Sequence, residues 1–234
     1  MIGEMWASMA VTGKAVIAIL SLLSIYSLSV VVERFVALRW AKRRTRDFAD
    51  EAEGITDPRV LRDRAMAPEY SDFASLAHIV GRSLDAYDII RDEEDDGDRI
   101  VEAVEEATTR QIDAAVINLR IRLSNLATVS GVAPFLGLFG TVTGLIAAFR
   151  GISESGGGGL AAVSSGVSEA LVTTVVGLFV AMPALWAYNY FMNRVETMSV
   201  DIDNQAHRLV MAVVRPQVTL TGSRVGANRH ERRT

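Results

Sequence analysis

The chain has 234 residues, half of them hydrophobic, with a formal net charge of −4 and no cysteine. Without cysteine there are no disulfides, thiolate metal sites or thiol nucleophiles, and the mildly acidic balance does not favour nucleic acid as a partner. The three histidines lack ligand-like spacing and no nucleophile–base constellation stands out, so we expect no metal site, no cofactor and no catalytic residue. The apolar residues gather in three blocks separated by charged segments, which favours an integral membrane protein over a soluble one.

The first uncharged block is 15–32, AVIAILSLLSIYSLSVVV. About 20 apolar helical residues cross a bilayer core, so the block predicts a transmembrane helix that follows a short N-terminal segment, 1–14. A cleaved signal peptide is the alternative. The apolar stretch is long for one, and charged residues follow it in place of a small-residue cleavage motif. These are Glu33, Arg34, Arg39, Lys42, Arg43, Arg44 and Arg46.

A charged segment, 33–122, comes next. Pro58 and Pro68 mark breaks in its helical pattern. The acidic run at 92–98 lacks the alternating ligand spacing and terminal glutamate of a calcium loop, so we interpret it as a solvated hinge. The segment is therefore expected to contain several helices joined by short connections.

The end of this segment, 99–122, has apolar residues at helical spacing, and neither glycine nor proline occurs before Gly131. This predicts one continuous helix that leads from the charged segment into the second apolar block. Its apolar stripe needs neighbours, and self-association is the simplest source of them.

The second and third blocks predict transmembrane helices at 123–149 and 166–193, because each is long enough to cross a bilayer. The 150–165 connection contains four consecutive glycines and is expected to be a flexible turn. A C-terminal helix and a loosely ordered basic tail are expected over 194–234, with the tail near anionic lipid headgroups.

Orientation follows from lysine and arginine near the ends of the spans. Basic residues follow the first span, precede the second and follow the third. The charged segment and the C-terminus are therefore expected in the cytoplasm, and the N-terminus and the 150–165 connection outside.

Polar side chains within the apolar blocks carry the functional signal. Glu169, near the start of the third block, would face a partner or a water-filled cavity, because a carboxylate in the membrane costs a few kcal/mol or more. The alternative is a hydrated position at the interfacial end of the helix. On a helical wheel Thr173 lies about 40° from Glu169 and Thr174 about 140° away. One of the two threonines would line a pore and the other would pack between subunits.

The second block combines hydroxyls with small residues. Thr141 and Thr143 lie within it, and Gly137, Gly140, Gly144 and Ala148 form a stripe that allows close helix packing. The second block contains Pro134 and the third contains Pro183, and a kink is expected at each proline.

Two segments resemble the signatures of the MotA/TolQ/ExbB proton channel family. One is Gly137-Leu-Phe-Gly-Thr-Val-Thr-Gly144, preceded by Ala133-Pro134. The other is Ser168-Glu-Ala-Leu-Val-Thr-Thr-Val-Val-Gly177, followed by Ala181-Met-Pro183 and Tyr188-Asn189. Together they cover residues 127–192 in the family's order and separation, and the number of spans agrees.

The resemblance implies an all-α, three-span subunit of a homopentameric ring in the bacterial inner membrane, with its N-terminus in the periplasm and long helices extending into the cytoplasm. It implies a single-span partner of the ExbD/TolR type that carries a proton-binding aspartate, and a TonB- or TolA-like energy transducer. The family's pore-facing threonines correspond to Thr141 and Thr174, and its third-span glutamate corresponds to Glu169. Thr173, Thr143, Gly137, Gly140, Gly144, Pro134 and Pro183 are secondary candidates for pore lining or packing.

These features predict a non-enzymatic proton channel subunit that couples the proton-motive force to TonB-dependent transport, Tol–Pal envelope maintenance or gliding. No span has a carboxylate at its middle, so a partner would supply the proton carrier. A small solute transporter and a passive membrane scaffold are the alternatives. A transporter usually shows inverted repeats and more spans, and a scaffold would not depend on the proton gradient.

Overall fold

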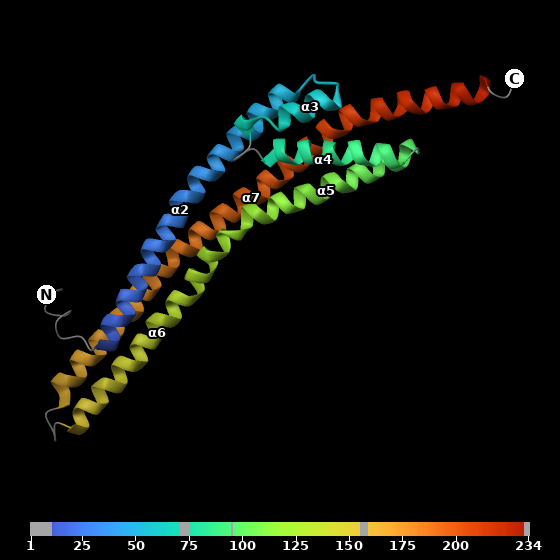
Figure 1. Cartoon of the computed structure of the whole chain (residues 1–234). Helices are drawn as coiled ribbons and strands as arrows, with labels where there is room; N and C mark the ends of the chain where they lie inside the picture. The colour runs from blue at the N-terminus through green and yellow to red at the C-terminus, as the bar shows by residue number, and fades with distance from the viewer. Residues whose placement is uncertain (1–10, 71–74, 95, 155–158, 232–234) are drawn as a thin grey trace. The chain divides into compact units, whose positions relative to one another are not determined.

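The computed structural model describes residues 11–70, 75–94, 96–154 and 159–231 (Figure 1). Within these ranges every regular element is a helix, which confirms the all-α prediction. In chain order the elements are α2 (Val11–Ala52), α3 (Pro58–Ala65), the 3₁₀ helix η1 (Pro68–Tyr70), α4 (Ser75–Glu93), α5 (Gly97–Ile121), α6 (Leu123–Glu154) and α7 (Gly159–Glu231).

Three helical stretches of the described residues are long and apolar enough to cross a membrane. They are Val11–Ala52, Gly97–Gly151 and Gly166–Thr219, and each contains one of the three predicted blocks. The three-span prediction agrees with the structure at this level. The exact limits of the spans stay predictions.

The prolines at 58 and 68 open new helices, as expected. Pro58 is the first residue of α3, where its missing N–H costs no intrahelical bond, and the Asp57 side chain accepts a hydrogen bond from the Arg59 amide. Pro68 opens η1. The 92–98 run ends α4 and begins α5, with the Asp96 carboxylate accepting from the Asp98 amide.

The predicted connection at 150–165 is largely helical, because α6 continues to Glu154 and α7 begins at Gly159. Leu160, Ala161 and Ala162 favour helix, which explains the early start of α7. Of the four glycines of the expected turn, 156–159, the first three lie outside the described residues and Gly159 begins α7.

The expectation of a loosely ordered tail differs from the structure, in which α7 runs through Pro216 to Glu231. Proline removes one N–H donor without obliging the chain to leave the helix. Val213 and Val214 are buried just before it, so packing holds α7 up to the proline. After it the Thr219 hydroxyl donates to the Arg215 carbonyl at 2.9 Å, a contact that a helical backbone provides.

The helix expected to be continuous from 99 onward is interrupted at Arg122, where a single turn residue separates α5 from α6. The apolar stripe of α5 is also covered within the chain, because Ile100, Val104, Ala107 and Ile112 are all buried. Neighbours within the same chain thus cover the first part of this stripe, whereas Ala115 and Leu119 farther along are only half-buried, and self-association stays a prediction.

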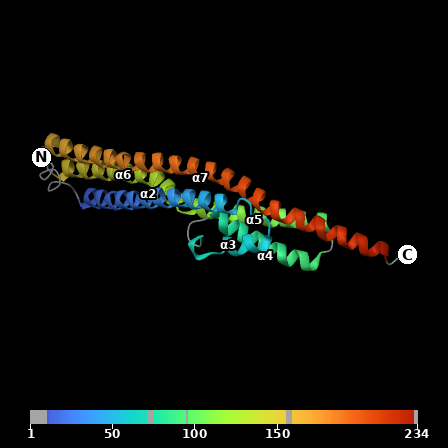
Figure 2. The same cartoon turned by 90° about the horizontal axis from the view of Figure 1, so that it is seen from above.

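The chain divides into two compact units, each made of segments that are distant in sequence. The first unit comprises Met1–Arg34 and Ile121–Met192, and the second comprises Phe35–Arg120 and Asn193–Thr234. In the first unit α6 runs beside the beginning of α7 and the beginning of α2 (Figure 2). Its buried core draws on all three helices: Val16, Leu20, Val129, Ala133, Val180, Ala181 and Ala184.

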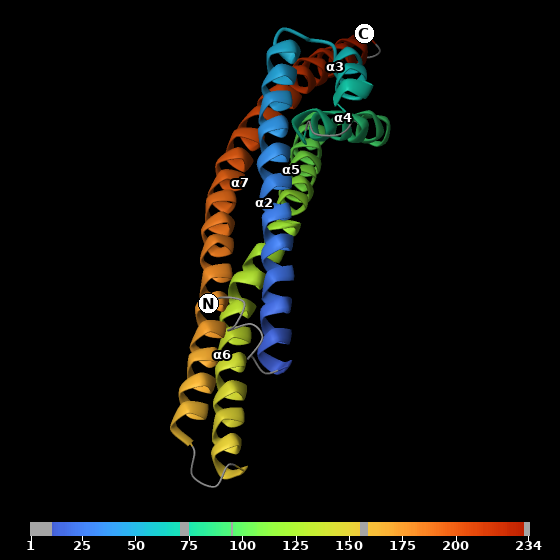
Figure 3. The same cartoon turned by 90° about the vertical axis from the view of Figure 1, so that its left-hand side faces the viewer.

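Within the first unit α6 and α7 run side by side (Figure 3), and at several glycines they approach too closely for a methyl group. A Cβ atom added at Gly137 would lie 3.0 Å from the Thr173 carbonyl oxygen, and one at Gly177 would lie 2.7 Å from the Ala133 carbonyl oxygen. The neighbouring atoms are backbone, which cannot move aside as a flexible side chain can. The two glycines therefore permit a backbone-to-backbone contact in the middle of the helix pair.

In the second unit, charged side chains fasten the short helices. The Arg62 guanidinium on α3 donates to the Asp88 carboxylate on α4 at 2.5 Å. The Tyr70 hydroxyl of η1 donates to the Glu51 carboxylate at the end of α2 at 2.5 Å, and Arg64 of α3 binds the same carboxylate. These contacts join α2, α3, η1 and α4.

Replacing Gly140 with alanine should destabilise the α6–α7 pair by roughly 1–3 kcal/mol, since the new Cβ would lie 2.6 Å from the Thr173 hydroxyl oxygen and overpack the contact. Gly131→Ala is the matched control on α6, because nothing lies within 4 Å of its added Cβ. The measurement is reversible unfolding in mixed micelles followed by tryptophan fluorescence. Equal stability of the two variants would contradict the close contact.

Tyr70→Phe should lower the melting temperature at neutral pH. Burial and the bond to Glu51 raise the pKa of Tyr70 to about 12, while the bonds from Tyr70 and Arg64 lower the pKa of Glu51. The Glu51 contribution is complete above its ordinary pKa and is lost as the pH falls, whereas the Tyr70 contribution is lost only between about pH 10 and 12.

The difference in melting temperature between wild type and Tyr70→Phe should therefore shrink as the pH falls below about 4.5. Tyr87→Phe is the control, because the Tyr87 ring is buried in the same unit but its hydroxyl does not bond to Glu51. A difference that stays constant from neutral to acid pH would show that the hydrogen bond to the ionised carboxylate does not stabilise the unit.

Candidate functional site

Three threonine hydroxyls gather around one backbone carbonyl at the close contact of α6 and α7. The Gly137 carbonyl accepts from the Thr141 hydroxyl at 3.0 Å, within α6, and from the Thr174 hydroxyl at 3.2 Å, across from α7. Thr173 also reaches this carbonyl, at 3.4 Å, although its shorter bond of 2.7 Å goes to the Ala170 carbonyl of its own helix. The Thr141 and Thr174 hydroxyls also hydrogen-bond to each other.

The structure thus brings Thr141 and Thr174 together, and both side chains are half-buried. Thr173 is fully buried in the contact with α6. The helical-wheel analysis placed these two α7 threonines on different faces relative to Glu169. In the structure both reach α6, because a helix in such close contact presents neighbouring positions to the facing backbone.

The proton inventory of the Thr141/Thr174 pair limits what it can offer to a ligand. Each hydroxyl carries one proton and two acceptor lone pairs. One of the two protons goes to the Gly137 carbonyl and the other to the second hydroxyl, so what remains on the pair is unused acceptor lone pairs. The pair can therefore accept a hydrogen bond from a protonated acid, whereas one hydroxyl would have to turn away from its present partner to donate to a carboxylate.

Gly140 and Gly144 lie on the same buried side of α6 as Gly137, and a Cβ added at Gly144 would lie 3.2 Å from the Ala170 Cβ. Glu169, the residue before Ala170, is half-buried. The carboxylate is therefore carried by a turn of α7 that is held against α6, within two turns of Thr174.

The remaining predicted residues lie outside the hydroxyl cluster. Thr143 is half-buried and directs its hydroxyl to the Phe139 carbonyl of its own helix at 2.9 Å. Pro134 is half-buried in the interior of α6, which continues through it, and Pro183 is exposed in α7. No group of three or more potential ligands among His, Cys, Asp and Glu clusters within the described part of the chain.

The α7 side of the helix contact was not predicted from the sequence. Gly166, Ala170, Thr173 and Gly177 are spaced by four, three and four residues, which places them on one helical face. A Cβ at Gly166 would lie 2.5 Å from the Ala148 Cβ, so this face meets the α6 stripe along its length. The spacing of these four small residues in the sequence would have been enough to predict this face of α7.

Polar contacts between α2 and α6 were also missed. The Asn125 side-chain amide donates to the Tyr26 hydroxyl at 2.6 Å, and the Arg122 guanidinium binds the Glu33 carboxylate. Both join residues about 90–100 positions apart in the sequence, and no local pattern predicts such a pair. They fix the register of α2 beside α6, the helix that carries Thr141.

Comparison with known proteins supports the resemblance. Residues 74–204, more than half of the chain, match the MotA/TolQ/ExbB proton channel family. The biopolymer transport protein ExbB of Neisseria gonorrhoeae is 45% identical over 87 residues, which is 37% of this chain and 40% of that protein.

Two proteins called Tol-Pal system protein TolQ are also similar. The one from Pseudomonas aeruginosa is 43% identical over 101 residues, 43% of this chain and 44% of that protein. The one from Haemophilus influenzae is 28% identical over 214 residues, 86% of this chain and 88% of that protein. The stronger local matches thus span about two fifths of their relatives, whereas the weaker one extends over nearly the whole chain. Together with the family match over 74–204, these similarities show that the chain belongs to the MotA/TolQ/ExbB proton channel family.

Proposed function

We propose that this protein is the channel-forming stator subunit of an inner-membrane motor driven by the proton-motive force. The observation that carries the proposal is the Thr141/Thr174 hydroxyl pair, held across two helices that are apolar enough to span the membrane. Membership of a proton channel family supports it. The role is non-enzymatic, and the protein transmits energy without transforming a substrate.

A second chain supplies the proton carrier. The partner is a single-span protein of the ExbD/TolR type whose aspartate meets the hydroxyl pair. Because the pair has lone pairs but no spare proton, it favours the neutral, protonated acid over the carboxylate. The aspartate would take up a proton from the periplasmic side, pass the pair in its neutral form, and release the proton to the cytoplasm.

The driving force per proton is modest. One elementary charge that crosses 100 mV delivers about 2.3 kcal/mol, so several protons must be coupled to do mechanical work at a distant envelope. A homopentameric ring around the partner would offer several equivalent hydroxyl pairs in turn. The similarity to proteins called ExbB and TolQ favours an output through a TonB- or TolA-like transducer, either uptake or envelope maintenance.

The orientation that completes this scheme has the N-terminus in the periplasm and the C-terminus in the cytoplasm. It rests on the lysine and arginine residues that flank the predicted spans. Large apolar side chains on the outer faces of the first unit, among them Phe135, Phe179 and Trp186, are exposed in the single chain. Lipid and neighbouring copies of the chain would cover them in the assembly.

Thr141→Val combined with Thr174→Val should abolish activity that depends on the proton gradient, while assembly and expression remain normal. Valine keeps the approximate shape of threonine but cannot hydrogen-bond. The serine double variant, which keeps both hydroxyls, should retain activity. Proton flux into vesicles that contain the channel and its co-encoded partner is the measurement.

Thr128→Val is the matched control for the valine pair, because the exposed Thr128 hydroxyl bonds only to the Ser124 carbonyl of its own helix, at 3.0 Å. Normal flux in the valine double variant would defeat the assignment. Normal function after collapse of the proton gradient would instead favour a passive scaffold.

Glu169→Gln should reduce proton flux or weaken assembly, since this carboxylate lies on the turn of α7 that packs against Gly144. A loss of about tenfold in flux corresponds to one charge-assisted hydrogen bond. Native mass spectrometry of the assembly separates the two effects. Glu196→Gln, an exposed change farther along α7, is the control. Wild-type flux and assembly would place Glu169 at a hydrated interface.

A further inference from the structure

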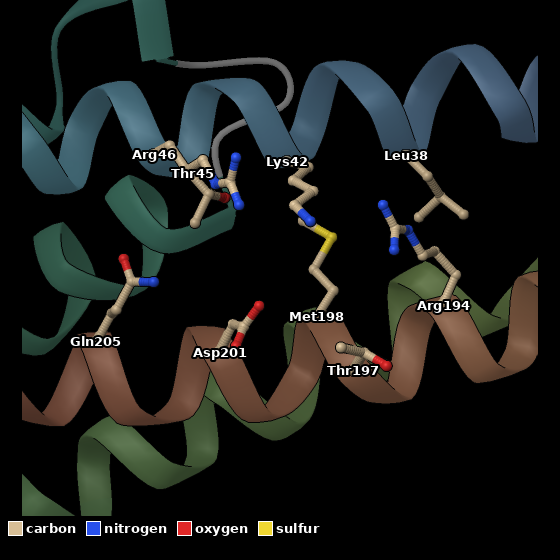
Figure 4. A pocket seen from close by; sticks show the side chains of 9 residues that line it. All are labelled: Leu38, Lys42, Thr45, Arg46, Arg194, Thr197, Met198, Asp201 and Gln205. Atoms are coloured by element: carbon tan, nitrogen blue, oxygen red, sulfur yellow. The ribbon is translucent and has the colours of Figure 1, made fainter.

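A small cavity lies between α2 and α7 in the second unit, outside the proposed channel (Figure 4). Its polar lining comes from Lys42, Thr45 and Arg46 on α2, and from Arg194, Thr197, Asp201 and Gln205 on α7. Leu38 and Arg194 lie at one end, and Arg46 and Gln205 lie at the other. The proton mechanism uses none of these side chains.

The charges around the cavity do not balance. Three cations and one acid line it, which leaves a net charge of two positive units by addition. Within the described ranges, none of Lys42, Arg46 and Arg194 forms an ion pair with a carboxylate. Like charges that share a cavity repel each other, so an anion in this space would stabilise the arrangement.

A buried hydroxyl gives a second, independent indication. Thr45 is only 4% exposed, and its hydroxyl has no hydrogen-bond partner within the described structure. The Gln205 side-chain amide oxygen, on the facing helix, is also buried and without a partner within the described structure, and as an acceptor it needs a donor such as water or a protonated phosphate oxygen. A buried polar group that lacks a partner costs roughly 1–3 kcal/mol, so such groups normally meet a ligand or water.

We propose that this cavity binds a phosphate group. Arg46 and Arg194 offer planar forks of N–H donors that match phosphate oxygens, Lys42 adds a compact charge, and the Thr45 hydroxyl donates a further hydrogen bond. The Asp201 carboxylate cannot donate to an unprotonated oxygen. It accepts from the protonated oxygen of hydrogen phosphate, or from a hydroxyl or ammonium group attached to a phosphodiester.

The size of the cavity restricts the ligand. Its volume is about 40 Å³, and one water molecule needs roughly 10–15 Å³ by this measure. A phosphate group of a few atoms fits, whereas the base and sugar of a nucleotide do not. The group could belong to free inorganic phosphate or to a phospholipid headgroup, because Arg194 is the first charged residue after the predicted third span.

Phosphate binding is tested on the purified full-length protein in detergent. Inorganic phosphate should raise its melting temperature relative to chloride at equal ionic strength. Lys42→Gln combined with Arg194→Gln should raise the dissociation constant for phosphate about tenfold or more, since two charged partners are removed. Arg43→Gln is the matched control, because Arg43 is exposed on α2 and does not line the cavity.

A second, milder variant tests the proposal even if the double variant does not fold. Thr45→Val removes the unpartnered hydroxyl but keeps the shape of the side chain, so the protein without phosphate should be at least as stable as wild type. Its phosphate affinity should nevertheless fall, by roughly three- to tenfold. Weakened phosphate binding without any loss of basal stability is not expected of a residue that serves only packing.

Native mass spectrometry with added phosphatidylglycerol distinguishes the two sources. A phospholipid retained by wild type and Arg43→Gln, but lost from Lys42→Gln/Arg194→Gln, supports the site with a headgroup as its ligand. Stabilisation by inorganic phosphate with the same dependence on the variants supports the site with free phosphate. Equal responses of wild type and the Lys42→Gln/Arg194→Gln variant to both probes would overturn the proposal.

Discussion

The close backbone contact between α6 and α7 is the constraint on which the rest of the first unit depends. Gly137 and Gly177 allow it, because a methyl group at either position would collide with backbone atoms of the facing helix. Only at this separation can the Thr174 hydroxyl reach the Gly137 carbonyl on the other helix. The same glycines that pack the helices therefore also position the polar site, so the packing and the geometry of the site cannot be varied independently here.

The contact also explains how a polar cluster is tolerated between two apolar helices. Hydroxyls in a membrane helix usually return to a carbonyl of their own helix, as Thr143 does. Thr141 does the same, but its carbonyl acceptor at Gly137 also lies within reach of Thr174 on the other helix, and the two hydroxyls contact each other, so each proton has an acceptor while acceptor capacity remains. Such a pair costs little when nothing is bound and still interacts with a neutral acid. These properties suit a surface that a proton carrier must pass repeatedly.

The sequence predicted the main features of the fold because they depend on local patterns. The three apolar blocks, the prolines that open α3 and η1, and the small-residue stripe of α6 can all be read over one or a few helical turns. The covered stripe of α5 could not be predicted, since its partners lie elsewhere in the chain. The pairs Arg122–Glu33 and Asn125–Tyr26 were missed for the same reason. The wheel analysis separated Thr173 from Thr174 correctly in angle, but it could not show that a close helix contact uses both.

The most direct test of the account is a high-resolution structure of the native assembly, isolated with its co-encoded single-span partner. The account predicts a ring of copies of this chain around an acid-bearing helix, with the acid within hydrogen-bonding distance of the Thr141/Thr174 pair of at least one copy. A central space without any acid-bearing helix, or a hydroxyl pair that faces lipid on the outside of the ring, would contradict it.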